Sequence, residues 1–128
     1  MFQRIRIRFS KLLLLVLIAG LAPTLSFAEK SAETQKGLLL LFLNPNGRPC
    51  QMQSQILKEN ITEIQKYVQV QGISTTVQSH RPHFYRFGVR QLPTLILIDT
   101  AGNVLHRFSP GIHQGDAILA EVRKLGSM

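Results

Sequence analysis

Cys50 is the residue of this chain best suited to covalent chemistry, and the sequence contains no other cysteine. A cysteine thiolate can act as a nucleophile or as a metal ligand. Two histidines stand close together in His80-Arg81-Pro82-His83, and with Cys50 they could supply three ligands to copper or zinc. Because Pro82 would break a helix that aligned the histidines, solvated loop residues are the simpler interpretation, and we expect no bound metal and no other cofactor.

The start of the chain has the pattern of a secretory signal. A basic segment with Arg4, Arg6, Arg8 and Lys11 precedes an apolar run at 12–22, and Ser26-Phe27-Ala28 offers small residues for cleavage. The apolar run is well short of the ~20 residues that span a bilayer. We therefore expect a signal peptide at 1–28, cleavage after Ala28, no lasting membrane span, and a periplasmic or secreted protein. A retained membrane anchor is the alternative.

Removal of this segment changes the charge of the protein. The whole chain has 15 Lys and Arg against 7 Asp and Glu, a formal net charge of +8. Cleavage would remove four basic residues and no acidic residue, which leaves +4. The remaining basic residues are dispersed, so the sequence does not favour nucleic-acid binding. An exported domain with one cysteine cannot form an internal disulfide, so Cys50 is either free or paired with another molecule.

The hydrophobic pattern predicts one α/β domain at 38–128, after a short polar leader at 29–37. Leu38–Leu43, apolar at every position, predicts a strand covered on both faces. From Cys50 onward, helical spacing predicts a helix of about five turns that ends at Gly72. The later elements are expected as a strand at 73–77, a short helix after Pro82, strands at 95–98 and 104–108 joined by a hairpin, and a last helix after 110–111. The order β-α-β-α-β-β-α implies a central mixed sheet flanked by helices.

Two segments of this pattern resemble thioredoxins. Gly47-Arg48-Pro49-Cys50-Gln51-Met52 follows an apolar strand and begins a helix, as the Cys-Gly-Pro-Cys motif of that family does. Phe87-Gly88-Val89-Arg90-Gln91-Leu92-Pro93-Thr94 resembles the family segment Gly-Val-x-x-Ile-Pro-Thr. The resemblance covers roughly residues 38 to 125. It implies a thioredoxin-like fold in which Pro93 is cis and faces the site.

The chain departs from the family at the positions that carry its chemistry. Gly47 stands where thioredoxins have the first, nucleophilic cysteine, and Cys50 stands where they have the second. Leu41 replaces the buried acid of the preceding strand, and Asn46 replaces the tryptophan before the motif. A thioredoxin uses one thiol to attack a disulfide and the other to release the mixed disulfide. This chain cannot complete that cycle alone.

Two functions remain open from the sequence. In the first, Cys50 lies in the first turn of a helix near Arg48, which favours the thiolate, and forms mixed disulfides with proteins or low-molecular-weight thiols that an external partner resolves. In the second, the thiol is buried and inert. The groove between Gly47-Arg48-Pro49-Cys50 and Leu92-Pro93-Thr94 then holds an extended peptide or a partner protein. A dimer linked through Cys50 is a third, lesser alternative.

Overall fold

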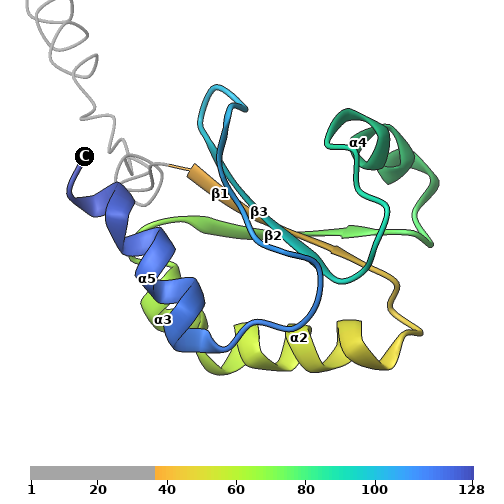
Figure 1. Cartoon of the computed structure of the whole chain (residues 1–128), viewed down its shortest axis with the longest axis horizontal. Coiled ribbons are helices and arrows are strands. Elements are labelled where there is room, and N and C mark those ends of the chain that lie inside the picture. Colours follow the sequence, from red (N-terminus) through yellow and green to blue (C-terminus); the bar gives the residue numbers. More distant parts are fainter. Residues whose placement is uncertain (1–36) are drawn as a thin grey trace, which may run out of the picture.

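The computed structural model of this chain describes residues 37–128. The expected signal peptide at 1–28, and the expected leader at 29–37 apart from its last residue, lie outside the described residues. A four-stranded sheet has helices on both faces (Figure 1). Between residues 37 and 128, no helix is long and apolar enough to cross a membrane.

The sheet has the strand order β2-β1-β3-β4. Strand β1 (Gly37–Leu43) pairs in parallel with β2 (Gln69–Ser74) and antiparallel with β3 (Thr94–Asp99). Strand β4 (Val104–Arg107) completes the sheet by antiparallel pairing with β3. The two central strands are apolar at nearly every position because both of their faces are covered. This arrangement confirms the central strand that was expected at Leu38–Leu43.

Two hydrophobic clusters attach the helices to the sheet. Successive side chains of a strand point to opposite faces, so β1 contributes Leu39 and Leu41 to one cluster and Leu40 and Phe42 to the other. The first cluster lies under α2 (Arg48–Glu59), the single turn α3 (Ile61–Ile64) and α5 (Gly115–Gly126). The second lies under a 3-10 turn, η1 (Gln78–His80), and the short helix α4 (Arg81–Arg86). The structure thus confirms an α/β thioredoxin-like fold with a mixed sheet.

The long helix that was expected from Cys50 to Gly72 is wrong in its extent. Helix α2 ends at Glu59, and Asn60 interrupts the helical segment before α3. Gly72 lies inside β2 and does not end a helix, so the expected strand at 73–77 begins earlier, at Gln69. The apolar spacing continued to Val68 because Val68, which follows α3, packs in the same cluster as residues of both helices.

Candidate functional site

The two segments that resemble thioredoxins come together at one end of the sheet. Strand β1 ends at Leu43 and leads through a turn into α2, whereas Pro93 immediately precedes β3. Because Phe42 is the register partner of Thr94, both loops leave the sheet at the same end. The Leu92–Pro93 peptide bond is cis, as the resemblance implied.

Cys50 lies in the first turn of α2 and is only 2% exposed. The backbone N–H of Asn44 donates a hydrogen bond to its Sγ at 3.3 Å. The N–H of Gly47 in turn donates to the carbonyl of Asn44 at 2.9 Å, which closes the turn beside the sulfur. A Cβ atom built on Gly47 would lie 3.7 Å from Sγ. The thiol is therefore covered by protein, and it is close to the position where the missing side chain would begin.

The remaining residues of the motif are more open to solvent. Arg48 and Pro49 are exposed, and Gly47 is half-buried. Pro49 fits the first turn of α2, where a backbone N–H has no partner within the helix. The Arg48 side chain makes no hydrogen bond or ion pair with residues 37–128. This arginine therefore leaves an uncompensated positive charge at the start of α2.

Leu41, at the position of the buried acid in thioredoxins, is itself part of the core. It is 4% exposed and belongs to the cluster that also contains Leu57 and Leu95. An apolar side chain at this position cannot accept or donate a proton. Cys50 therefore lacks the proton-transfer group that the resemblance assigns to this position.

The loop before β3 offers unpaired main-chain groups at Leu92. Leu92 is half-buried, and its backbone N–H and C=O form no hydrogen bond with the described part of the chain. The carbonyl of Pro93 accepts a hydrogen bond from the N–H of Gly111 at 2.9 Å. Thr94 is 1% exposed, and its hydroxyl donates to the carbonyl of Gln91 at 2.6 Å. Of the three residues expected in the groove, Leu92 has unpaired backbone groups, whereas the Thr94 side chain is buried.

Gln53 is a polar residue behind the site that sequence analysis missed. It is fully buried in α2, and its amide forms two hydrogen bonds with the backbone of His113. The ring of His113 also forms a hydrogen bond with the carbonyl of Ser109 at 2.7 Å. One signal was present in the sequence, because Gln53 precedes Leu57 by four residues and so lies on the apolar face of the helix. A polar side chain at such a position has to find partners.

The histidines do not join Cys50 in a metal site. Nδ1 of His80 accepts a hydrogen bond from the N–H of Ser74 at 2.9 Å, and the ring centroid of His83 lies 6.4 Å from that of His80. Within the described part of the chain, no group of three or more His, Cys, Asp or Glu residues could hold a metal ion. Pro82 lies in the first turn of α4 and does not break this helix.

No family model and no curated protein sequence matches this chain, but its structure is similar to those of several thioredoxin-fold proteins. Thioredoxin-2 of the malaria parasite has a TM-score of 0.61 at 20% identity, over 70% of this chain and 82% of that chain. A thioredoxin-fold protein from Helicobacter pylori has a TM-score of 0.63 at 18% identity, over 73% and 70% of the two chains. Thioredoxin from Trypanosoma brucei brucei has a TM-score of 0.61 at 17% identity, over 74% and 80%. Likeness at such low identity establishes the fold alone. The chain is a thioredoxin-fold protein with a single cysteine.

Proposed function

We propose that this protein is an exported binding module that holds an extended segment of a partner protein beside Leu92, without thiol–disulfide turnover. The burial of Cys50 carries this proposal. Disulfide exchange requires the attacking sulfur to reach a sulfur of the partner. Cys50 is 2% exposed, and its Sγ already accepts a hydrogen bond from Asn44. The fold is thus retained, whereas the nucleophile is missing at Gly47 and the remaining thiol is covered.

The loop before β3 supports the binding role. The backbone N–H and C=O of Leu92 have no partner within residues 37–128, and they can pair with an extended peptide in the manner of an added strand. Arg48 provides an unpaired positive charge at the same end of the sheet. Complementary charge selects a partner and accelerates its association. The preferred segment is therefore extended and carries an acidic residue.

A second function, mixed-disulfide formation, is favoured by one observation. Gly47 has no side chain that could cover Cys50, and a Cβ at this position would lie 3.7 Å from the sulfur. In this function the Cys50 thiolate attacks a disulfide, forms a new S–S bond to one sulfur and releases the other sulfur as a thiolate. A thiol from an external partner then attacks the mixed disulfide and restores the Cys50 thiol. Small disulfides, which can approach a glycine closely, are the appropriate substrates.

The reaction of the folded protein with iodoacetamide separates the two functions. Cys50 is the only thiol, so intact mass reports its modification directly, and Cys50→Ser is the control. The binding module predicts modification in denaturant and almost none in the native state. Rapid alkylation of the native protein, with a rate midpoint well below the ordinary thiol pKa of ~8.5, would overturn the proposal in favour of mixed-disulfide formation.

Binding itself is tested by selection from a library of short random peptides displayed on phage. The selected peptides should be enriched in acidic residues and should shift the amide NMR signal of Leu92. Arg48→Gln should weaken their binding, whereas Lys58→Gln, at an exposed position near the other end of α2, should not. Peptides that bind without any effect at Leu92 or Arg48 would contradict the proposed groove.

Export is proposed from the pattern of residues 1–28 and has a separate test. When the full chain is expressed in a Gram-negative host, the periplasmic protein should begin at Glu29 by N-terminal sequencing. A protein that starts at Met1 and fractionates with the membrane would support a retained anchor instead.

A further inference from the structure

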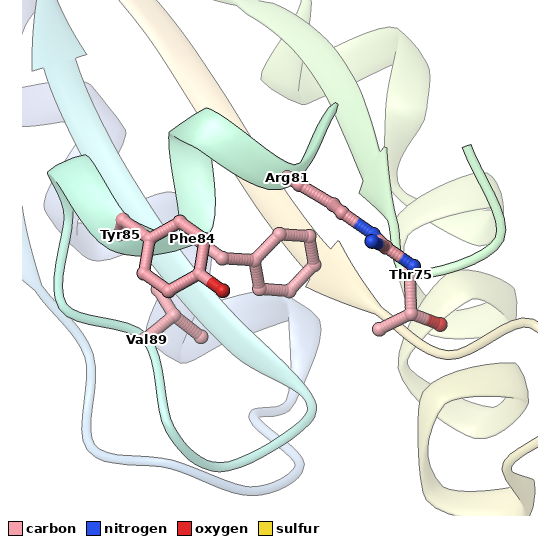
Figure 2. A pocket seen from close by; sticks show the side chains of 5 residues that line it. All are labelled: Thr75, Arg81, Phe84, Tyr85 and Val89. Carbon is pink, nitrogen blue, oxygen red and sulfur yellow. The ribbon is translucent and has the colours of Figure 1, made fainter. Parts of the chain in front are cut away.

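A pocket lies on the face of the sheet opposite α2, the helix that carries Cys50. It is formed by α4 and the segments next to it, and it has a volume of about 320 Å³. Arg81 and Thr75 lie at one end of this pocket, and Phe84, Tyr85 and Val89 gather at the other (Figure 2). Small-molecule sites commonly have volumes of about 300 to 1,000 Å³, so this pocket has room for one ring and a short polar group.

The apolar end of the pocket is held in place by the fold. Phe84 packs edge-on against Phe42 of the central strand, with ring centroids 5.1 Å apart. The N–H of Val89 donates to the carbonyl of Phe84 at 2.9 Å, and this hydrogen bond holds Val89 beside Phe84 in the wall of the pocket. Gly88 makes this hydrogen bond feasible, because its φ of 58° is one that residues with a side chain rarely adopt. Arg107 adds hydrogen bonds to the carbonyls of Phe87 and Gly88.

Tyr85 forms the outer part of this wall. It is 84% exposed, although tyrosine usually buries much of its ring. Its hydroxyl makes no hydrogen bond with the described residues. An aromatic ligand that lies against Phe84 and Val89 would cover part of this ring, and so bury apolar surface of both the ligand and the protein.

The other end of the pocket carries a positive charge that nothing in the described structure balances. Arg81 makes no hydrogen bond or ion pair with residues 37–128. No Asp or Glu occurs between Glu63 and Asp99 in the sequence. Asp99 pairs with Gly37 at one end of the sheet, whereas Thr75 follows Ser74, the partner of Leu43, at the opposite end. The acidic residues of α2, α3 and α5 lie on the other face.

We propose that this pocket binds a small aromatic carboxylate, with the carboxylate on Arg81 and Thr75 and the ring against Phe84, Tyr85 and Val89. A guanidinium is the side chain best matched to a carboxylate, since it can donate two parallel hydrogen bonds. The hydroxyl of Thr75 points away from Phe84 in Figure 2, and rotation of this side chain would let it donate a further one. The residues that line this pocket include neither Cys50 nor Leu92.

The test is an NMR titration of the purified protein with 3-phenylpropionate at millimolar concentrations. The amide signals of Thr75, Arg81 and Val89 should shift and saturate. The neutral analogue 3-phenylpropanamide and the variant Arg81→Gln should each weaken binding by about tenfold, the size expected for a hydrogen bond to a charged group. Arg90→Gln is the matched control, because Arg90 is also exposed but does not line the pocket.

Three results would overturn the proposed site, and a fourth would overturn its proposed ligand. The first is the absence of saturable shifts at these residues. The second is equal affinity for the acid and the amide, which would show that Arg81 contributes nothing. The third is an equal loss of affinity for 3-phenylpropionate in Arg81→Gln and Arg90→Gln, which would show that the ligand is attracted only by the overall positive charge of the protein. If N-acetyl-glycyl-phenylalanine binds more tightly than 3-phenylpropionate and shifts the same signals, the pocket recognises a peptide C-terminus, and the proposed small-molecule ligand is wrong.

Discussion

Gln53 and His113 are joined by two hydrogen bonds of opposite direction although they lie 60 residues apart in the sequence. Gln53 Nε2 donates to the carbonyl of His113 at 3.0 Å, and Gln53 Oε1 accepts from its N–H at 2.6 Å. The loop that contains His113 also contains Gly111, whose N–H donates to the carbonyl of Pro93. These contacts connect the helix that carries Cys50 to the loop that carries Pro93.

Replacement of Gln53 tests the importance of this connection. Gln53→Leu removes both hydrogen bonds and leaves the N–H and C=O of His113 without these partners. The free energy of unfolding should fall by about 1 to 3 kcal/mol, measured by urea denaturation. Gln55→Leu is the control on the exposed side of α2, and it should change stability by less than about 0.5 kcal/mol. Equal effects of the two variants would show that the buried pair contributes little.

Gly47→Cys should introduce an internal disulfide. The backbone of Gly47 has φ −83° and ψ 130°, which any residue adopts, and a Cβ there would lie 3.7 Å from the Sγ of Cys50. Small adjustments then bring the two sulfurs to bonding distance. In air the variant should lose two hydrogen atoms by intact mass and should no longer react with iodoacetamide in denaturant. Gly47→Ser is the control, and persistent free thiols in Gly47→Cys would contradict the geometry of the site.

Gly115 should tolerate no side chain while Asn60 stays in place. A Cβ on Gly115 would clash with the side-chain amide of Asn60, whose Nδ2 donates to the carbonyl of Ile56 at 2.8 Å. Gly115→Ala should therefore destabilise the protein by about 1 to 3 kcal/mol, although alanine favours a helix. In a double-mutant cycle, Asn60→Ala should relieve most of this loss. Additive effects of the two substitutions would show that the clash is absent.

The contribution of Asp99 to stability should disappear in acid. The backbone N–H of Asn103 is the main cause of the lowered pKa of this carboxyl, and the side chain of Asn103 and the N–H of Ala101 add to it. A group whose pKa is lower in the folded protein stabilises it above the unfolded pKa, and this contribution is lost as the pH falls through the folded pKa. The difference in melting temperature between wild type and Asp99→Ala should be constant near neutral pH and should shrink below about pH 4. A difference that does not change with pH would contradict this account.

The sequence alone determined the architecture of the described domain. A strand that is covered on both faces must be apolar throughout, so Leu38–Leu43 and the run at 95–98 identified the central strands directly. The element order followed from local patterns, whereas the thioredoxin-like fold and the cis bond before Pro93 were implied by the resemblance of two segments to thioredoxins. The replacement of the first cysteine by Gly47 is also visible in the sequence itself.

Only the tertiary structure decided where the helical segment ends and how the site is covered. Val68 continued the helical spacing because separate elements pack into one cluster, and periodicity does not distinguish this case from a single helix. The burial of Cys50 depends on the turn that places Asn44 against its sulfur, and the pairing of Gln53 depends on a loop 60 residues away. Local sequence fixes which segments form helices and strands, whereas the exposure and the partners of a single side chain depend on contacts between segments that only the folded chain brings together.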